Sequence, residues 1–120
     1  MKKVLLCDDD KTLIKVVEFI VQGLGVEVVS VTEGDLAMNA AKTSSPSLIL
    51  LDLSLPGKDG MTVLKELKSD LATLNIPVVI VSAQECKESV NQAFKLGALD
   101  YIIKPFKPEE LLALISKYLN

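Results

Sequence analysis

The sequence predicts an α/β fold of the (βα)5 type: a doubly wound, five-stranded parallel sheet with helices on both faces. Short apolar runs alternate with longer amphipathic stretches along the chain, and there are five of each. The first, third and fourth runs are almost continuously apolar, which is typical of strands that a parallel sheet buries on both faces. Alternation of this kind indicates a parallel sheet whose right-handed crossovers place helices on both sides.

The five predicted strands are short and end close to polar residues. They cover residues 4–7, 26–31, 48–51, 77–81 and 101–103. The second contains Glu27 and Ser30, so we expect it at an edge of the sheet. We expect the first, third and fifth strands to be neighbours at the centre of the sheet.

The predicted helices follow from apolar residues spaced three or four apart. We expect Gly25 to end the first helix and Gly97 the fourth. The last helix begins at Pro108, a favourable first position, and Glu109 follows at the positive end of the helix dipole. The apolar stripes are Leu13, Val16, Val17, Ile20 and Leu24 in the first helix; Leu36, Ala37, Ala40 and Ala41 within 35–42; Val63, Leu64 and Leu67 within 61–71; Cys86, Val90, Ala93, Phe94 and Gly97 in the fourth; and Leu111, Leu112, Ile115 and Leu119 in the last.

Length and composition favour one domain. A chain of 120 residues matches a common domain size, and 49% hydrophobic residues are enough for a core. The five units use up the sequence, without a linker or a repeat. We therefore expect a single domain over residues 1–120, with no output domain in this chain.

Composition also argues against several classes of protein. Sixteen acidic residues against 13 basic ones give a net charge of −3, which argues against direct nucleic-acid binding. No apolar run is long enough for membrane insertion, and the N-terminus lacks the pattern of a secretory signal. The chain has no histidine, and its two cysteines show no ligand spacing. We expect a cytoplasmic protein without histidine-based catalysis.

Charged residues follow three of the predicted strands. Asp8, Asp9 and Asp10 follow the first strand, Asp52 follows the third and Lys104 follows the fifth. Ligands of parallel sheets bind outside the carboxyl ends of the strands. Clustered carboxylates repel one another unless a proton or cation intervenes, and oxygen ligands suit hard divalent cations. The pattern predicts a metal and phosphoryl site, although Asp10 is better explained as the N-cap of the first helix.

Such a cluster can support phosphoryl transfer to a carboxylate. A carboxylate can act as a nucleophile and form an aspartyl-phosphate, with a metal ion neutralising the surrounding oxygens. Lys104 offers a second cation on a long side chain. Ser82, directly after the fourth strand, offers a hydroxyl, although a serine there is also a common helix N-cap.

Four stretches resemble one family in the correct order. VLLCDDD, LILLDLSLPGKDG, IPVVIVSA and GALDYIIKPF resemble the CheY-like receiver domain of two-component response regulators. The most specific parts are D-x-x-x-P-x-x-D-G, from Asp52 to Gly60, and the triplet Lys104-Pro105-Phe106. The resemblance covers essentially the whole chain.

The resemblance implies a role for each site residue. Asp52 would be the phosphoacceptor, and Lys104 would bind the phosphoryl group. Asp9 would bind Mg²⁺ or Mn²⁺ directly, and Asp8 would bind it through a water molecule. Ser54 would contribute its backbone carbonyl to the same metal ion.

The resemblance also implies a switch. Ser82 would supply the switch hydroxyl, and Tyr101 would change rotamer on the fifth strand. Pro105 would follow a cis peptide bond. Ser54 and Gln84 occupy positions that vary in the family and tune hydrolysis.

The partners follow from the same resemblance. A histidine kinase or histidine phosphotransfer protein would donate the phosphoryl group. The surface of the fourth helix, fifth strand and fifth helix would then signal to a downstream protein that the sequence does not identify. The resemblance implies a self-phosphorylating and auto-dephosphorylating signalling domain rather than a turnover enzyme. Leu13 and Ile14 cannot both face the sheet, so one of them is a candidate contact for the donor.

Two other functions are compatible with the predicted fold. A flavodoxin-like nucleotide binder holds phosphate after the first strand, but three carboxylates there would repel it. A receiver-like interaction module that takes no phosphoryl group would lack the acceptor, the acid pair or the lysine. All of these are present in this sequence.

Overall fold

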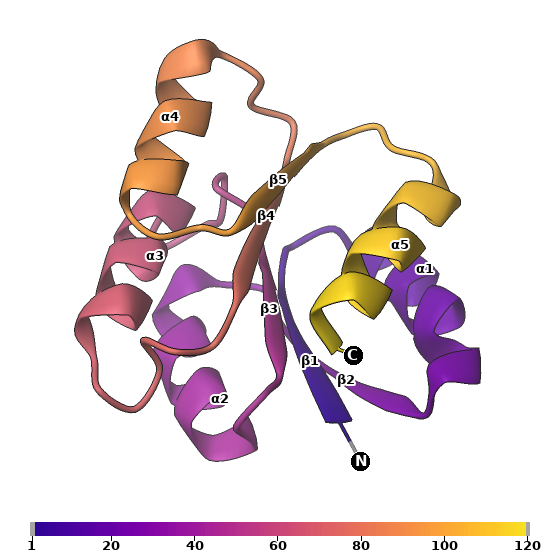
Figure 1. Ribbon diagram of the computed structural model, residues 1–120. Coiled ribbons are helices and arrows are strands. Elements are labelled where there is room, and N and C mark those ends of the chain that lie inside the picture. Colours follow the sequence, from indigo (N-terminus) through magenta and orange to yellow (C-terminus); the bar gives the residue numbers. More distant parts are fainter. Residues whose placement is uncertain (1, 120) are drawn as a thin grey trace.

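The computed structural model describes residues 2–119. Within this range, one parallel sheet contains five strands in the order β2-β1-β3-β4-β5 (Figure 1). The strands are β1 (Lys2–Cys7), β2 (Val26–Val31), β3 (Leu48–Leu51), β4 (Val78–Ser82) and β5 (Asp100–Ile103). The predicted fold class is confirmed, and β2 lies at an edge as expected.

One prediction about the sheet is wrong. The first and third strands are neighbours at the centre as expected, but the fifth does not join them, because β4 lies between β3 and β5, and β5 forms the second edge. After β2 the chain crosses to the other side of β1, and each later strand adds one place further from β1. The topological switch point therefore lies between β1 and β3. A side chain that follows β5 therefore has to extend past the end of β4 to reach the residues that follow β1 and β3.

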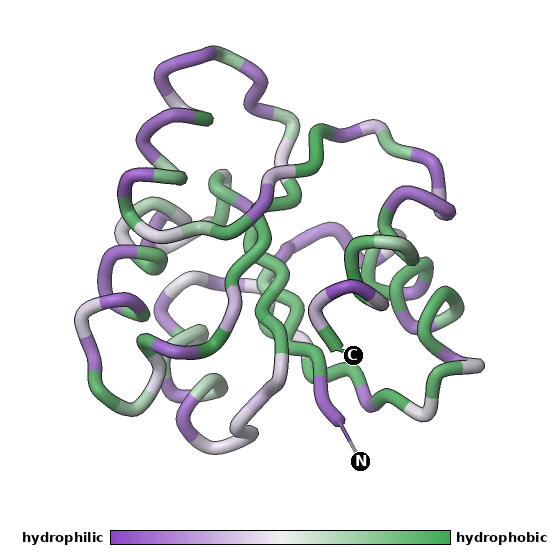
Figure 2. The backbone as a smooth tube through the Cα atoms, viewed as in Figure 1, coloured by the Kyte–Doolittle hydropathy of each residue, from purple (hydrophilic) through white to green (hydrophobic). Residues whose placement is uncertain are grey.

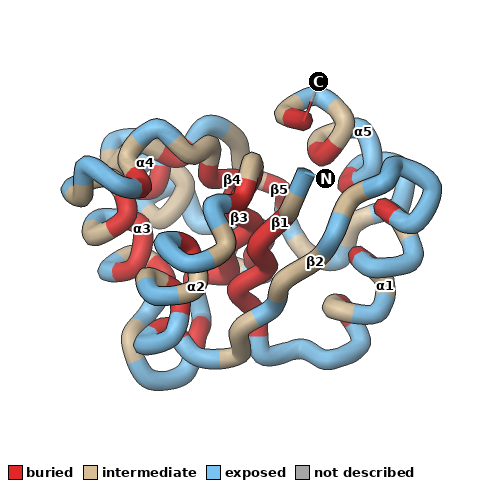
Figure 3. Tube along the Cα trace, turned by 90° about the horizontal axis from the view of Figure 1, so that it is seen from below, coloured by how far each residue is buried: buried red, intermediate tan, exposed pale blue. Residues whose placement is uncertain are grey.

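Helices cover both faces of the sheet (Figures 1 and 3). The helices α1 and α5 pack on one face, and α2, α3 and α4 pack on the other. Their bounds are α1 (Lys11–Val21), α2 (Ala37–Ser44), α3 (Gly60–Ser69), α4 (Lys87–Lys95) and α5 (Pro108–Leu119), with short 3₁₀ helices at Gln22–Leu24 and Gly34–Leu36. Within the described residues, no helix is long and apolar enough to span a membrane.

The two faces of the central strands divide the core in two. Leu5 and Cys7 pack toward α2, α3 and α4, whereas Val4 and Leu6 pack toward α1 and α5. All residues of β3 and β4 are buried. Hydrophobic residues accordingly run through the middle of the molecule in Figure 2, where Figure 3 marks buried chain. Burial on both faces also explains why β3 has no polar residue and why β4 has one, Ser82, at its carboxyl end.

Four helix stripes differ from the prediction at their margins, and in the second of them Leu36 is exposed. Val21 is buried, but Leu24 is exposed because the chain tightens into a 3₁₀ helix after Val21 and changes its period. Phe94 is exposed beside buried Ala93, and Leu112 is exposed beside buried Leu111. Successive helical residues point about 100° apart, so both neighbours of a fully buried residue cannot also face the sheet.

The glycine predictions hold in part. Gly25 has φ +66° and ends the 3₁₀ helix rather than α1 itself. Gly97 has φ +111° and follows the C-cap of α4. Both positive φ values lie in the region that residues with a side chain rarely adopt.

Candidate functional site

Three carboxylates converge at the carboxyl edge of the sheet. Backbone bonds extend the strand pairing by one residue: Asp8 N–H donates to Val31 O at 3.0 Å, and Asp52 N–H donates to Cys7 O at 2.9 Å. These bonds hold the residues that follow β1 and β3 next to each other. One carboxylate oxygen each from Asp8, Asp9 and Asp52 lies within 4.8 Å of the others. Asp8 and Asp52 are buried, whereas Asp9 is exposed.

Lys104 reaches this cluster from the edge strand. Its Nζ donates to Asp8 Oδ2 at 2.7 Å and lies 3.5 Å from Asp52 Oδ2. Its backbone N–H donates to Ser82 O at 2.9 Å, which fixes the start of its side chain beside β4. The long side chain then spans the end of β4. The following peptide bond, Lys104–Pro105, is cis.

The charges at the site are unbalanced. Burial raises the pKa of Asp8 above its usual range, although Lys104 and the Asp10 N–H oppose the change. Burial lowers the pKa of Lys104, but the Asp8 and Asp52 carboxylates outweigh it, so this pKa is raised and the ammonium group stays charged. Three carboxylates thus share one ammonium group. A divalent cation with oxygen ligands fits the remaining negative charge.

Local contacts orient Asp52. Its Oδ1 accepts the Ser54 N–H at 3.1 Å, while Oδ2 faces Lys104. At Gly60 a Cβ atom would collide with the Asp52 carbonyl, so only glycine fits there. Asp59 is the N-cap of α3 and accepts the Thr62 N–H at 3.0 Å. These contacts explain the last two residues of the D-x-x-x-P-x-x-D-G pattern.

Asp10 has a structural role. Its Oδ1 accepts the backbone N–H groups of Thr12 at 2.9 Å and Leu13 at 3.3 Å, which confirms it as the N-cap of α1. The Asp10 N–H in turn donates to Asp8 Oδ1 at 2.9 Å. The start of α1 therefore orients the Asp8 carboxylate.

Ser82 is buried and does not cap a helix. The N-cap of α4 is Cys86, four residues further on, so the capping explanation for Ser82 is wrong. Its Oγ accepts the Gln84 N–H at 3.2 Å. The Tyr101 hydroxyl donates to the Gln84 carbonyl at 2.6 Å, which brings Tyr101 to the same loop.

Sequence reasoning missed the contacts that Gln84 makes through its side chain. Its Nε2 donates to Ser54 Oγ at 3.1 Å, and its Oε1 accepts the Ser89 hydroxyl at 3.0 Å. The resemblance named Ser54 and Gln84 together as positions that tune hydrolysis, but it implied no bond between them. No sequence signal links two residues that are 30 positions apart, and Ser89 has no distinguishing pattern.

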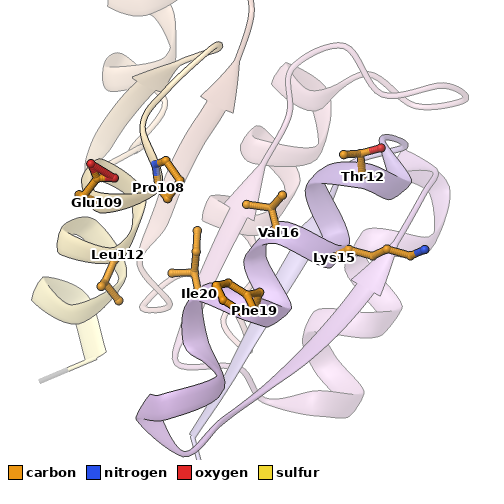
Figure 4. Close-up of a pocket in the computed structure, with 8 residues that line it drawn as sticks. All are labelled: Thr12, Lys15, Val16, Phe19, Ile20, Pro108, Glu109 and Leu112. Carbon is orange, nitrogen blue, oxygen red and sulfur yellow. The ribbon is translucent and has the colours of Figure 1, made fainter.

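An apolar groove between α1 and α5 begins beside the site. Figure 4 shows Val16, Phe19 and Ile20 of α1 facing Leu112 and Pro108 of α5. An adjoining depression shares residues with this groove and reaches Asp10, Lys104 and Phe106. Phe19 is 78% exposed. Leu13 is buried and Ile14 is half-buried, so Ile14 is the more accessible of that pair.

Comparisons with known proteins agree with this geometry. The model of the response regulator receiver domain family matches residues 4–116. The chain is 35% identical to the DNA-binding response regulator MtrA of Mycolicibacterium paratuberculosis over 99% of this chain and 52% of that protein. It is 37% identical to the phosphate regulon regulatory protein PhoB of Escherichia coli, over 96% of this chain and 50% of that protein. The chain thus spans about half the length of these curated relatives.

Solved structures show the same fold. The BeF3-activated receiver domain of Klebsiella pneumoniae RstA has a TM-score of 0.90 at 29% identity, with 99% of each chain covered. The receiver domain of the sensor histidine kinase PA1611 from Pseudomonas aeruginosa has a TM-score of 0.87 at 26% identity, covering 98% of this chain and 97% of that one. That structure has a magnesium ion coordinated in its active site cleft. This chain belongs to the response regulator receiver domain family.

Proposed function

We propose that Asp52 is the phosphoacceptor of this receiver domain, and that a histidine kinase or histidine phosphotransfer protein supplies the phosphoryl group. The observation that carries the proposal is the convergence of Asp52 with Asp8, Asp9 and Lys104 at one edge of the sheet. An Asp52 carboxylate oxygen forms a bond to phosphorus while the bond to the donor histidine breaks, and the histidine nitrogen keeps the electron pair. Lys104 then binds a phosphoryl oxygen.

Mg²⁺ or Mn²⁺ would be held by Asp9 and Asp52 directly, by the Ser54 carbonyl, and by Asp8 through water. When bound, the cation neutralises the carboxylates and the phosphoryl oxygens. The donor set of the site fits this role, because all of these groups present oxygen. In an NMR titration with Mg²⁺, Asp9→Ala should lose most of the binding. Unchanged affinity in that variant contradicts the ligand set.

The donor protein would dock in the groove between α1 and α5. This groove is continuous with the depression that contains Lys104, so a helix lying in it can present a histidine to Asp52. Its walls are apolar, and Lys15 and Glu109 lie at its margins. A groove of this type suits the apolar face of a helix.

The phosphorylated state would signal through α4, β5 and α5. Movement of the Ser82 hydroxyl toward the phosphoryl group removes a hydrogen-bond acceptor from Gln84, the residue that also holds Tyr101. Tyr101 would then change its position in a shift between two pre-existing states. The downstream protein is unidentified. We assign these roles to a single domain over residues 1–120, and we expect it to act in the cytoplasm.

The experiment uses acetyl phosphate as the donor, so that no kinase is needed. Intact-mass measurement should show one added phosphoryl group with Mg²⁺ present and none with a chelator. Asp52→Asn should abolish the addition, because an amide is not a nucleophile of this type. Full phosphorylation of Asp52→Asn would contradict the assignment of the acceptor.

A further inference from the structure

Gln84 is hydrogen-bonded at all four of its polar groups. Its N–H donates to Ser82 Oγ and its carbonyl accepts from the Tyr101 hydroxyl. Its side-chain Oε1 accepts from Ser89, and its Nε2 donates to Ser54. A half-exposed glutamine in a loop normally keeps much of its rotamer freedom. These contacts remove that freedom, so the loop after β4 holds Gln84 in one orientation.

Ser89 determines which way the Gln84 amide faces. The Ser89 oxygen accepts the Cys86 thiol at 3.1 Å, so its own proton is directed to Gln84 Oε1 at 3.0 Å. An amide that accepts on one side must donate from the other. The Gln84 NH₂ group consequently faces Ser54, at 3.1 Å. Ser89 belongs to α4, whereas Ser54 belongs to the loop after β3.

The hydrogen bond between Gln84 and Ser54 lies at the edge of the acceptor site. Ser54 is two residues after Asp52, and its N–H donates to Asp52 Oδ1 at 3.1 Å. The Gln84 side chain therefore joins the loop after β4 to the loop that carries the acceptor. The same Ser54 contacts, through its backbone N–H, the Asp52 carboxylate oxygen that does not face Lys104.

We propose that Ser89 is a positioning residue that holds the Gln84 amide across the edge of the acceptor and thereby prolongs the lifetime of the phosphoryl group. The effect on lifetime rests on the proposed phosphorylation of Asp52. In hydrolysis a water oxygen bonds to phosphorus and the bond to Asp52 breaks. The carboxylate leaves with the electron pair, while the protons of the water leave with inorganic phosphate and the solvent. The Ser54–Gln84 bridge restricts the approach of that water, and Ser89 keeps the bridge closed.

The positioning role is tested first in the unphosphorylated protein. The side-chain amide resonances of Gln84 are assigned by their loss in Gln84→Ala. In Ser89→Ala they should move to the values of a freely rotating glutamine, whereas Ser89→Thr retains the hydroxyl and should preserve the native shifts. Ser116→Ala, a helical serine of α5 beside Lys2, is the matched control and should change nothing at Gln84. Native Gln84 shifts in Ser89→Ala overturn the proposal.

The lifetime effect is tested by following dephosphorylation after acetyl phosphate is removed. Loss of one neutral hydrogen bond should speed hydrolysis by roughly three- to tenfold in Ser89→Ala. Ser89→Thr and Ser116→Ala should match the wild type, and Ser89→Ala should add nothing in a Gln84→Ala background. No change in Ser89→Ala, slower hydrolysis, or an equal change in both backgrounds overturns the proposal.

The two readouts separate the two claims. A wild-type protein that takes up no phosphoryl group overturns the proposed function and the lifetime effect together. The amide shifts then decide the positioning role alone. Alanine has a high helix propensity, so Ser89→Ala should fold, and its thermal midpoint is measured alongside.

Discussion

Asp8 is a buried carboxylate whose charge is only partly compensated. Its side chain is 1% exposed, and Lys104, its ion-pair partner, also lies 3.5 Å from Asp52. Burial is the main reason why the pKa of Asp8 is raised. A raised carboxyl pKa means that the folded protein binds the proton more tightly than the unfolded chain does. The stabilisation from protonated Asp8 is therefore present at low pH and is lost as the pH rises through the folded pKa.

Asp8→Asn should stabilise the metal-free protein at neutral pH. The amide removes the buried charge and keeps an oxygen for the Asp10 N–H. Because burial raises the pKa of Asp8 in spite of the Lys104 ion pair, we expect the free energy of unfolding to rise by about 1 kcal/mol in urea titrations. This gain in stability should shrink as the pH falls toward 3.8, the ordinary pKa of an aspartate, because the wild-type carboxyl then becomes neutral as well. A loss of stability, or a gain that is independent of pH, contradicts this account. Asp9→Asn, at an exposed position, is the control and should change stability little.

The site residues differ in how far the sequence could predict them. Asp52 and Lys104 were predictable because each follows directly on an apolar run, and parallel strands end at the same edge. The bonds of Gln84 were not predictable. They depend on where α4 begins, which places Ser89 within reach of the Gln84 amide, and on the path of the loop that carries Ser54.

At the level of elements, α1 serves both the core and the surface. Leu13, Val17 and Val21 are buried against the sheet. Phe19 points away from that face, beside the groove toward α5 (Figure 4). The apolar spacing predicted the helix but not its exact buried stripe, because Val21 takes the place that the period assigned to Leu24. An exposed phenylalanine beside an apolar groove is the kind of feature that marks a binding surface.

Phe19→Ala should slow phosphoryl transfer from the donor protein without changing the reactivity of Asp52. We expect transfer from the cognate kinase to fall by roughly tenfold or more, as for an aromatic residue at the centre of an interface. Uptake from acetyl phosphate should be unchanged, because Phe19 is not among the residues that line the depression containing Lys104. Ile14→Lys, at the half-buried position nearer the site, should also slow transfer.

The matched control for Phe19 is Leu71→Ala. Leu71 is 90% exposed and follows α3, on the opposite face of the sheet. Equal transfer rates in wild type and Phe19→Ala would rule out docking in this groove, and an unchanged rate in Ile14→Lys would rule out a donor contact at Ile14. A rate lowered equally by Leu71→Ala would show that the effect is not specific to α1.

For the whole molecule, the order of the strands decides which residues meet. The alternation of apolar runs and amphipathic stretches predicted five parallel strands, but the pattern within each strand does not record its neighbours. The continuous apolar runs of β1, β3 and β4 identify the central strands. The weaker pattern of Asp100–Ile103, with one exposed and two half-buried residues, is that of an edge strand and could have corrected the predicted order.

The two cysteines report on the opening of this sheet. Burial, with a smaller contribution from Asp8, raises the pKa of Cys7 to about 12, whereas Cys86 is exposed. In the native protein a thiol reagent should therefore modify Cys86 at once and Cys7 only after global unfolding. In Cys86→Ser, Mg²⁺ at about 100 times its Kd should slow the modification of Cys7 about a hundredfold, because it binds only the folded state. Rapid modification of Cys7 in the native protein contradicts a rigidly closed sheet.

The most direct measurement concerns the atom that carries the phosphoryl group. The protein is treated with acetyl phosphate and Mg²⁺, and borohydride then reduces any acyl phosphate to an alcohol, which converts a phosphorylated aspartate to homoserine. Peptide mass spectrometry locates the converted residue. Our account predicts homoserine at position 52 alone, and none when Mg²⁺ is removed by a chelator. Homoserine at position 8 or 9, or at 52 without a divalent cation, would contradict it.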